Sequence, residues 1–266
     1  QLKLAKVIPL FKKGSTYLSG NYRPISLLNI FDKLLEKVMY NRLYNHLQAN
    51  NILYDFQFGF RKNYSTTLAL VDVVDNIYKH LDDGKLGVGI YLDLQKAFDT
   101  VNHRILLRKL YHYGIRGVVH EWFQSYLDNR QQFTCISGIR STLANITCGV
   151  PQGSVLGPLL FLIYINDIGN AVVHQKVKLF ADDTNVFVFG DNLSDVETNA
   201  NSCLSALNNW FICNKLSLNL SKTCYMIFSN KTSADLKLCL NGKNIERISH
   251  FKYLGVIIDE ELKWSV

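Results

Sequence analysis

Apolar residues recur at three- and four-residue intervals in two stretches of the first third of the chain. After Pro24 this spacing predicts an amphipathic helix over residues 25–49, and it predicts a second helix over residues 66–82. A glycine-rich run over residues 84–94 then indicates a turn that leads into a buried strand. The apolar stripe of the first helix is expected to consist of Leu27, Leu28, Phe31, Leu34, Leu35, Val38, Met39 and Leu43.

The rest of the chain alternates between helix and strand patterns. Further helices are expected over residues 102–112, 118–127, 155–167 and 195–214, and further strands over residues 131–137, 142–148, 177–181, 184–189, 223–229, 236–240 and 244–258. The dipeptide Asn241-Gly242 is a hairpin signal. This order is typical of an α+β domain whose antiparallel sheet is covered by helices on one face, which leaves the other face for a ligand.

Three aspartates lie where such strands would end. The tetrapeptide Phe180-Ala181-Asp182-Asp183 forms a tight turn between two predicted strands, and Asp93 ends an earlier one. Carboxylates at one end of a sheet suit magnesium, which takes hard oxygen ligands and usually keeps waters and substrate phosphates. An Asp-Asp pair alone more often marks a solvated turn, as Asp82-Asp83 is expected to do. The Asp182-Asp183 pair therefore supports a metal site only where the residues around it do so as well.

Composition narrows the class of protein. A length of 266 residues suffices for one large domain or two subdomains, and the net charge of +7 is compatible with a polyanionic partner. The six cysteines lack the paired spacing of zinc sites, which favours reduced thiols and an intracellular location. No apolar run reaches the about 20 residues of a spanning helix, and no signal peptide is visible. Because the chain starts at Gln1 and stops abruptly, it is expected to be an internal fragment.

Three segments in a fixed order carry a family resemblance. Their order resembles motifs A, B and C of reverse transcriptases: Tyr91-Leu92-Asp93-Leu94-Gln95-Lys96-Ala97-Phe98-Asp99, Gly149-Val150-Pro151-Gln152-Gly153-Ser154-Val155-Leu156-Gly157-Pro158 and Phe180-Ala181-Asp182-Asp183. Four more resemble flanking motifs of the non-LTR (LINE, jockey-like) retrotransposon branch: Asn21-Tyr22-Arg23-Pro24-Ile25-Ser26-Leu27-Leu28, Gln57-Phe58-Gly59-Phe60-Arg61, Asn219-Leu220-Ser221-Lys222-Thr223 and Phe251-Lys252-Tyr253-Leu254-Gly255. Seven ordered matches over nearly the whole chain argue strongly against coincidence.

The resemblance implies the fingers and palm of a right-hand polymerase. The fingers would span about residues 1–84 and part of 112–148, the palm about 85–111 and 149–258, and the start of the thumb connection 259–266. The thumb would be missing or truncated, and the endonuclease of such elements would be absent.

The same resemblance assigns chemistry to the acids. Asp93, Asp182 and Asp183 would bind two magnesium ions, for which manganese can substitute, with help from the backbone carbonyl of Leu94. Phosphoryl transfer is catalysed mainly by positioning and charge neutralisation, which suits this set of ligands. Lys222 matches a lysine that approaches the leaving pyrophosphate, and the alternative is a solvated lysine in a turn.

Five residues are expected to contact the incoming nucleotide: Lys12, Lys13, Arg23, Phe98 and Gln152. Phe98 matches an aromatic residue that packs beneath the sugar and excludes a 2′-hydroxyl, although a purely core phenylalanine is the serious alternative. Gln152 supplies an amide that can bond sugar, base or template. Arg23 is similar to an arginine that grips the triphosphate, assisted by Lys12 or Lys13.

Template and primer contacts are implied for a further set of residues: Arg61, Pro151, Gly153, Phe251, Lys252, Tyr253, Leu254 and Gly255. Arg61 contacts a template phosphate or only packs along the protein surface, and the sequence supports both equally. Residues 251–255 would form the primer grip, a hairpin that aims the 3′ end, although their aromatic rings fit an ordinary core equally well. His103 and His120 show no metal-binding spacing and receive no role.

The sequence thus predicts a non-LTR reverse transcriptase that extends a DNA primer on an RNA template with deoxynucleoside triphosphates. The parent element would act in the nucleus and cytoplasm without a membrane partner, and the oligomeric state is left open. A non-catalytic RNA-binding scaffold is the rival class, against which the three intact aspartates argue. An RNA-templated RNA polymerase shares these acids, but Phe98 and the Pro151-Gln152-Gly153 loop favour DNA synthesis.

Overall fold

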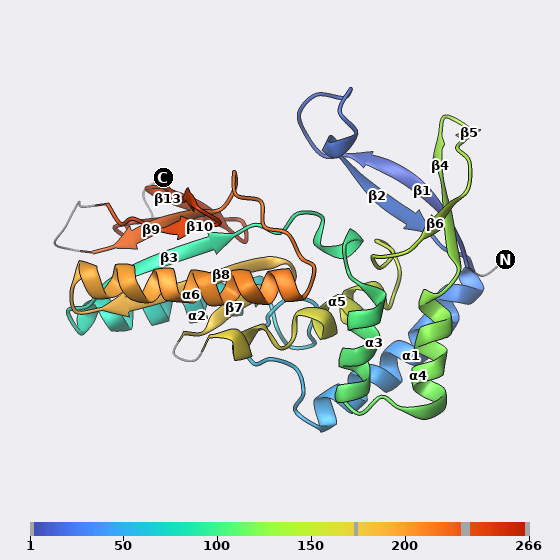
Figure 1. Ribbon diagram of the computed structural model, residues 1–266, viewed down its shortest axis with the longest axis horizontal. Coiled ribbons are helices and arrows are strands. Elements are labelled where there is room, and N and C mark those ends of the chain that lie inside the picture. Colours follow the sequence, from blue (N-terminus) through green and yellow to red (C-terminus); the bar gives the residue numbers. More distant parts are fainter. Residues whose placement is uncertain (1–2, 173–174, 230–234, 264–266) are drawn as a thin grey trace. The chain divides into compact units, whose positions relative to one another are not determined.

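The computed structural model describes residues 3–172, 175–229 and 235–263. Its helices and strands, shown in Figure 1, group into two compact units, each built from two stretches of chain. Unit 1 comprises residues 1–53 and 96–165, and unit 2 comprises residues 54–95 and 166–266. Among the described helices, none is both long and apolar enough to cross a membrane.

Unit 1 contains a five-stranded sheet: β1 Leu4–Phe11, β2 Tyr22–Leu27, β4 Arg130–Ile136, β5 Ile139–Arg140 and β6 Ala144–Ile146. The strand order is β2-β1-β4-β5, with β6 also pairing with β4, and only the β1–β4 pair is parallel. Pro9 of β1 and Pro24 of β2 lie opposite each other in this pair of strands. Because proline cannot donate to a ladder, it weakens the strand signal, and the sequence analysis did not predict these two strands.

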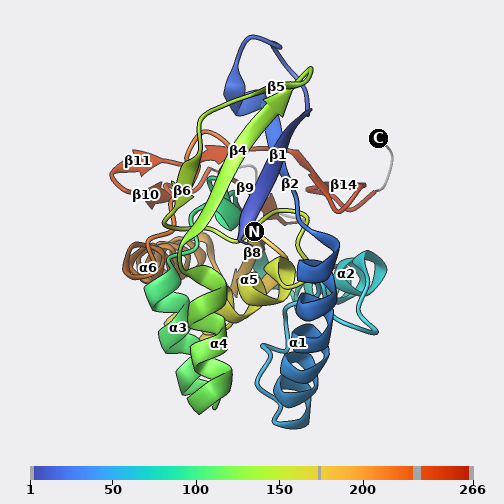
Figure 2. The same cartoon turned by 90° about the vertical axis from the view of Figure 1, so that its right-hand side faces the viewer.

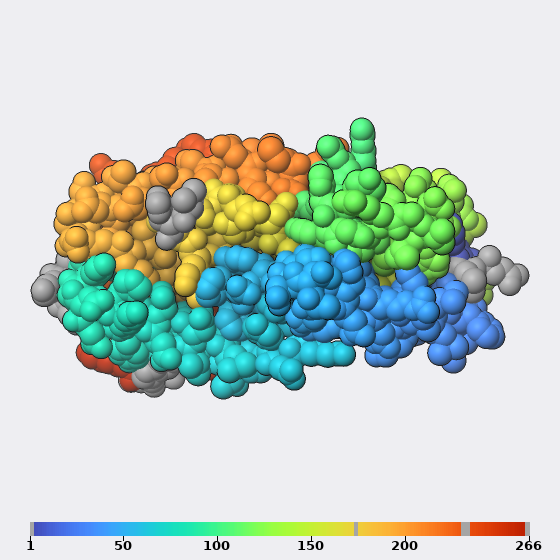
Figure 3. Space-filling model, turned by 90° about the horizontal axis from the view of Figure 1, so that it is seen from below, coloured from blue at the N-terminus to red at the C-terminus, as the bar shows by residue number. Residues whose placement is uncertain are grey.

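Four helices complete unit 1: α1 Ile30–Ala49, α3 His103–His112, α4 Gly117–Leu127 and α5 Gly157–Ile165. Figure 2 shows β1, β2 and β4 rising above α1, α3 and α4. In the surface view of Figure 3, the blue segment that contains α1 and the green segments that contain α3 and α4 lie side by side. α5 is buried along almost its whole length, so it forms the centre of this unit.

Helix α1 differs from its prediction in two ways. It begins at Ile30 rather than at residue 25, because residues 22–27 form β2 and the side chain of Asn29 caps the helix by accepting a hydrogen bond from the N–H of Phe31. The predicted apolar stripe is also largely exposed, and its exposed residues are Leu27, Phe31, Leu34, Leu35 and Val38. The buried face instead carries Asp32 and Glu36 beside three apolar or aromatic residues. The spacing thus predicted the helix correctly and its buried face wrongly.

Unit 2 contains a second five-stranded sheet: β3 Leu86–Leu92, β7 Val177–Phe180, β8 Asp183–Gly190, β9 Cys224–Phe228 and β12 Glu246–Arg247. The strand order is β12-β9-β3-β8-β7, and every neighbouring pair except β12–β9 is antiparallel. The central strand β3 is buried almost throughout, as its continuous apolar run predicted.

Both faces of this sheet are covered. α6 (Leu193–Cys213) lies on one face, where a Cβ at Gly190 would contact Val196. α2 (Thr66–Asp82) and the hairpin of β13 (His250–Tyr253) and β14 (Val256–Asp259) pack against the other face in one apolar cluster. The expectation of a face left for a ligand was therefore wrong, because this cluster fills it. The expected ligands Asp93, Asp182 and Asp183 lie at the ends of the strands.

Two glycines explain the composition of β3. A Cβ at Gly87 would lie 2.6 Å from a ring atom of Phe189, and a Cβ at Gly89 would lie 3.0 Å from ring atoms of Phe187 and Phe228. The aromatic rings come from the neighbouring strands β8 and β9. The missing side chains therefore make room for large rings in the core, which fixes the three strands against one another.

The other expected elements are confirmed within one to three residues at their ends, except for residues 244–258, which the structure divides among the four short strands β11, β12, β13 and β14. β10 (Cys239–Leu240) and β11 (Lys243–Asn244) form the hairpin at Asn241-Gly242, whose φ angles of 52° and 72° suit such a turn. The bounds of fingers and palm stay a prediction, because two compact units do not by themselves define the parts of a hand. Of the expected thumb connection, residues 264–266 lie outside the described residues.

Candidate active site

Strand register brings the three aspartates of unit 2 together. In the antiparallel pair of β3 and β8, Leu92 lies opposite Thr184, so continuing the register by one residue sets Asp93 opposite Asp183. Phe180 pairs with Asp183 across the β7–β8 hairpin, and the two-residue turn between them contains Asp182. The carboxylates thus lie at one end of the sheet, where the sequence analysis placed them.

Gln57 holds the turn between β7 and β8. This buried side chain accepts hydrogen bonds at Oε1 from the N–H groups of Ala181 (3.0 Å) and Gly59 (2.8 Å), and its Nε2 donates to the carbonyl of Ala181 (3.4 Å). Ala181 needs such support because its φ of 56° lies in the left-handed region, which costs a non-glycine residue roughly 1–2 kcal/mol. A Cβ at Gly59 would lie 2.3 Å from the nitrogen of Ala181, so only glycine fits there.

The chain around Gln57 forms an isolated parallel β-bridge with Leu179 of β7. The N–H of Phe58 donates to the carbonyl of Leu179 (2.8 Å), and the N–H of Leu179 donates to the carbonyl of Phe56 (2.9 Å). Phe56, Gln57 and Phe58 therefore lie against β7, next to the acidic turn. This placement gives the segment 57–61 a supporting role that the sequence analysis missed.

Arg61, at the end of the same segment, contacts its own neighbourhood. Its guanidinium donates to the carbonyl of Tyr54 (2.8 Å) and lies 4.1 Å from the ring centroid of Tyr64. These contacts favour the packing interpretation of Arg61 over the template one. Contact with a template phosphate stays a prediction.

The acids repel one another. Burial, followed by the charges of Asp182 and Asp93, raises the pKa of Asp183 to about 6. Within the described residues, no three acidic, histidine or cysteine side chains are already arranged around one point as a finished metal site. Repelling carboxylates at neighbouring strand ends are nevertheless the donor set that magnesium prefers, and a divalent cation would offset their charge. The assignment of these acids and of the Leu94 carbonyl as ligands stays a prediction that this chemistry supports.

Lys222 is brought to the acids by a turn. The N–H of Asn219 donates to the carbonyl of Asp93 (2.7 Å), and the N–H of Lys222 donates to the carbonyl of Asn219 (3.1 Å). The Nζ of Lys222 consequently lies 3.6 Å from a carboxylate oxygen of Asp93, although 66% of the lysine side chain is exposed. The lysine is thus both solvated and paired with an acid, and its role at a pyrophosphate stays a prediction.

The loop that carries Gln152 is built within unit 1, and we call residues 149–157 the glutamine loop. Its first part is fixed on the end of motif A, because the N–H of Val150 donates to the carbonyl of Phe98 (2.8 Å). The side-chain amide of Gln152 donates from Nε2 to a carboxylate oxygen of Asp99 (2.8 Å). This bond sets the orientation of the amide and leaves its Oε1 as an acceptor.

The middle of the glutamine loop is fixed on β2. The N–H of Ser26 donates to the carbonyl of Gln152 (2.7 Å), and a Cβ at Gly153 would lie 2.9 Å from the carbonyl oxygen of Ser26. Gly153 also has a φ of 106°, which only glycine adopts without strain. Close approach to β2 therefore explains the glycine, and contact of Pro151 and Gly153 with a template stays a prediction.

Glu36 of α1 holds the end of the glutamine loop. It is 1% exposed, and one carboxylate oxygen accepts from the hydroxyl of Tyr126 (2.7 Å). The other oxygen accepts from the N–H groups of Val155 (2.6 Å) and Leu156 (3.4 Å), just before α5, where the helix dipole favours an anion. Burial, followed by the charge of Glu36, raises the pKa of Tyr126 above its ordinary range.

Phe98 is half-buried and stacks on Phe161 of α5, with ring centroids 4.6 Å apart and ring planes at 24°. One face of the ring therefore belongs to the core, as the alternative interpretation requires, while the rest of the side chain is partly accessible. Both interpretations of Phe98 are compatible with this position, so its contact with a sugar stays a prediction.

The three cations expected at a triphosphate lie on the β1–β2 hairpin of unit 1. Arg23 pairs with Leu10 across the two strands, and the N–H of Lys12 donates to the carbonyl of Asn21 (2.9 Å) just beyond them. The side chains of Lys12, Lys13 and Arg23 are exposed. The structure thus brings these cations to one hairpin, and which lysine assists Arg23 stays open.

Residues 251–255 form the expected hairpin. β13 and β14 are joined by Leu254 and Gly255, whose φ angles are 49° and 96°. The ring of Phe251 stacks on Tyr91 with centroids 3.9 Å apart, and Tyr253 is 2% exposed. Burial, followed by the charge of Asp183, raises the pKa of Tyr253 above its ordinary range. The hairpin therefore belongs to the core beside the acids, and contact of residues 251–255, including the exposed Lys252, with a primer stays a prediction.

Three residues that build these sites received no role from the sequence: Gln57, Gly59 and Glu36. Gln57 and Gly59 stand inside a quoted motif, so their signal was visible, but the motif does not say which distant segment it supports. Glu36 lies in the predicted helix, where a glutamate is ordinarily on the solvated face. A signal in the sequence would have been that the residues around Glu36 in this helix cannot all face solvent.

Comparisons with known proteins identify the family of the chain. The family model for reverse transcriptase (RNA-dependent DNA polymerase) matches residues 11–258. The RNA-directed DNA polymerase from mobile element jockey of Drosophila melanogaster is 31% identical over 274 residues, which cover 99% of this chain and 30% of the relative. The probable RNA-directed DNA polymerase from transposon BS of the same species is 31% identical over 280 residues, covering 100% and 30%. The chain thus spans less than a third of the length of these relatives.

Solved structures share the fold at low sequence identity. Apo telomerase from Candida Tropicalis matches with a TM-score of 0.65 and 12% identity, covering all of this chain and 48% of that one. The form truncated from the C-terminal domain matches with a TM-score of 0.61 and 14% identity, covering 97% and 53%. This likeness shows the fold alone, the right-hand polymerase fold that the sequence analysis expected. The chain belongs to the reverse transcriptase family, and the two relatives described here are named as RNA-directed DNA polymerases of mobile element jockey and transposon BS.

Proposed function

We propose that this chain is the polymerase core of a non-LTR retrotransposon and extends a DNA 3′-hydroxyl primer on an RNA template. The observation that carries the proposal is the acidic end of the unit 2 sheet. There Asp93 and Asp183 lie in register, and Gln57 holds the turn that contains Asp182. The two insect relatives described above are named as RNA-directed DNA polymerases, which supports the same activity.

In unit 2, Asp93, Asp182 and Asp183 would hold two magnesium ions. The ions, when bound, supply charge neutralisation at the transferred phosphate and activation of the primer hydroxyl. Lys222, already beside Asp93, would stabilise the charge that develops on the leaving pyrophosphate. Burial, together with the charges of Asp182 and Asp93, raises the pKa of Asp183, and bound magnesium would offset those charges.

In unit 1, Phe98 and Gln152 would select the nucleotide. The amide of Gln152 is oriented by Asp99, so its Oε1 can accept a hydrogen bond from a sugar hydroxyl or a base. Phe98 would lie against the sugar and exclude a 2′-hydroxyl, which favours deoxynucleotides. Arg23, with Lys12 or Lys13, would bind the triphosphate through its planar set of donors.

The test is primer extension on an RNA template with magnesium and deoxynucleoside triphosphates. The wild-type chain is compared with Asp182→Asn/Asp183→Asn and with the matched control Asp82→Asn/Asp83→Asn. Both changes remove two charges from an Asp-Asp pair, but Asp82 and Asp83 are exposed residues at the end of α2. We expect the first variant to lose extension and the control to keep it.

Three outcomes would contradict the proposal. Incorporation of ribonucleotides in preference to deoxynucleotides would indicate an RNA-templated RNA polymerase. Equal extension by the wild type and the Asp182→Asn/Asp183→Asn variant would remove the acids from the chemistry. Binding of primer and template without any extension by the wild type would favour the RNA-binding scaffold.

A further inference from the structure

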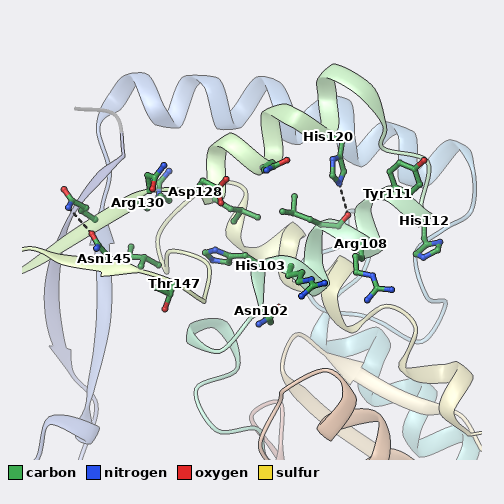
Figure 4. A pocket seen from close by; sticks show the side chains of 17 residues that line it. Asn102, His103, Arg108, Tyr111, His112, His120, Asp128, Arg130, Asn145 and Thr147 are labelled. Atoms are coloured by element: carbon green, nitrogen blue, oxygen red, sulfur yellow. Dashed lines mark hydrogen bonds between the residues drawn. The ribbon is translucent and has the colours of Figure 1, made fainter.

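Unit 1 has a pocket that the proposed function does not use. It has a volume of about 1000 Å³ and lies between α3, α4 and the strands β4 and β6. Figure 4 shows its side chains, with His120 of α4 pointing toward α3. We call it the α3–α4 pocket. None of its lining residues is among those expected to contact template, primer, nucleotide or metal.

The α3–α4 pocket is lined by positive charge. Arg104, Arg108 and His112 follow one another at four-residue intervals on α3, so they lie roughly 6 Å apart along one side of the helix. Arg104 and Arg108 are exposed. Asp128 is the single acid among the lining residues. The two arginines at this spacing match the regularly spaced phosphates of a nucleic-acid strand.

A buried arginine adds to this field. Arg130 lines the same pocket and is 2% exposed. One of its terminal nitrogens donates to the carbonyl of Tyr126 (3.3 Å), whereas its Nε and other terminal nitrogen have no hydrogen-bond partner among the described residues. The positive charge of Arg130 attracts an anion in the pocket, although the charge of Asp32 offsets part of it.

Two histidines fix the walls of the pocket. The Nε2 of His120 on α4 donates to the carbonyl of Leu107 on α3 (3.0 Å), as the dashed line in Figure 4 shows. The Nε2 of His103 donates to the carbonyl of Gly149 (2.7 Å), the first residue of the glutamine loop. The pocket is therefore held open by side-chain bonds between its elements, and one wall is directly bonded to the loop that carries Gln152.

The pocket also presents an aromatic ring and neutral polar groups. Tyr111 is 50% exposed, and its ring meets the ring of His120 edge to face at 5.8 Å. Exposed aromatic rings beside cations are the surface on which unpaired bases stack. The neutral polar side chains that line the pocket are Asn102, Gln124, Asn129, Gln131, Asn145 and Thr147. Such groups can bond base edges and the 2′-hydroxyl that distinguishes RNA from DNA.

We propose that the α3–α4 pocket binds a segment of single-stranded RNA, with phosphates on Arg104 and Arg108 and a base against Tyr111. The choice of RNA rests on the proposed function, because a chain that copies RNA meets this polymer first. An acidic peptide would satisfy the arginines, but it would leave the aromatic ring and the neutral polar groups without a matching chemistry. His103 links the bound strand to the glutamine loop.

The test measures binding of a short, fluorescein-labelled, single-stranded RNA to the 266-residue chain by fluorescence anisotropy, without primer or nucleotide and with a chelator in place of metal. Arg104→Ala/Arg108→Ala is compared with the matched control Lys33→Ala/Arg42→Ala. Both variants lose two exposed cations from a helix of unit 1, but the control residues lie on α1 outside the pocket. Thermal melting checks that both variants are folded.

We expect the pocket variant to bind RNA about tenfold more weakly than the control. Because each phosphate contact to a single strand contributes about 0.7 to the slope of log affinity against log salt, that slope should fall by about 1.4 in the pocket variant. Equal weakening by both variants would overturn the proposal, since binding would then follow overall charge. Equal affinity for single-stranded DNA of the same sequence, or preferential displacement of the RNA by polyglutamate, would overturn the choice of RNA.

Cross-linking decides the matter if the double variant fails to fold. RNA that contains 4-thiouridine should cross-link on irradiation to wild-type peptides from residues 103–112, and cross-links confined to other segments would overturn the proposal. The Asp182→Asn/Asp183→Asn variant should bind this RNA like the wild type. Failure of primer extension with intact pocket binding would therefore contradict the proposed polymerase alone, and extension with no pocket binding would contradict this inference alone.

Discussion

The acidic turn of unit 2 and the glutamine loop of unit 1 are each held by one buried polar side chain, but the two side chains differ in charge. Gln57 is neutral and makes three hydrogen bonds to the chain around the turn. Glu36 is a carboxylate and accepts three hydrogen bonds. Beside three aspartates a further anion would add repulsion, whereas ahead of α5 an anion is favoured by the helix dipole. The surrounding electrostatic field, rather than the number of bonds, thus decides which charge each position tolerates.

The largest effect is expected from breaking the support of the acidic turn sterically. Gly59→Ala would place a Cβ 2.3 Å from the backbone of Ala181, so the turn must shift. We expect the free energy of unfolding to fall by about 3 kcal/mol and primer extension to fall about a hundredfold, because small displacements at catalytic groups have large effects on rate. Chemical denaturation and primer extension measure these changes.

The control for this substitution is Gly20→Ala, where a Cβ would meet nothing within 4 Å. The control should keep both stability and activity. A Gly59→Ala chain that behaves like the Gly20→Ala chain would show that the turn does not depend on the close approach of segment 57–59.

The neutral side chain of Gln57 can be replaced by a charged one of nearly the same size. Gln57→Glu keeps two accepted hydrogen bonds, loses the donor to Ala181 and adds an anion near the carboxylates. We expect a loss of about 2 kcal/mol in the free energy of unfolding at pH 8 in a chelator, part of which magnesium restores by offsetting the added charge. Equal stability of the two chains at pH 8 would contradict the electrostatic half of the comparison.

The opposite exchange, in which a neutral glutamine replaces Glu36, should lower the free energy of unfolding less. Glu36→Gln turns one accepting oxygen into a donor that faces an N–H or hydroxyl donor, and we expect a loss of about 1 kcal/mol. Because the glutamine loop then loosens, the KM for deoxynucleotides should rise more than kcat falls. A fall confined to kcat, or a gain in stability, would show that Glu36 does not position this loop.

The smallest expected effect comes from titrating the acids. The pKa of Asp183 is raised to about 6 from the ordinary 3.8, so the folded chain binds a proton that the unfolded chain releases between these values. Stability in a chelator therefore falls as pH rises from about 4 to about 6 and stays lower above that range. Asp183→Asn removes this loss and should stabilise the chain at pH 8 by about 1 kcal/mol or less, since the carboxyl is partly exposed to solvent.

Thermal melting between pH 4 and pH 8 checks this effect, with Asp82→Asn as the control. At pH 4 the Asp183→Asn and wild-type chains should melt together, because both residues are then neutral. A constant difference at every pH would mean that packing, rather than charge, separates the two chains.

Most of the fold could be predicted from local pattern. The period of apolar residues predicted α2 within its bounds, and the continuous apolar run before Asp93 predicted β3. The order of motifs A, B and C, which carries the family resemblance, predicted the acids at the end of this strand. These features depend on neighbours in the sequence, so a sequence alone contains them.

The side chains that hold the two loops could not be predicted in this way. Gln57 lies 124 residues from Ala181, and Glu36 lies 119 residues from Val155. A single sequence gives the polarity of such residues but not their partners. The same limit explains α1, whose periodicity is correct but whose buried face includes the carboxylate of Glu36, which contacts the glutamine loop, and excludes Leu34 and Leu35.

The exposed apolar residues of α1 have a consequence for solution work. Ile30, Phe31, Leu34, Leu35 and Val38 form a contiguous uncovered strip on one helix. Such a strip promotes self-association, which sulfate or phosphate salts strengthen, whereas the same salts weaken contacts with a polyanion. Aggregation and RNA binding by the isolated chain should therefore respond to salt in opposite directions, and light scattering across a salt series would separate one from the other.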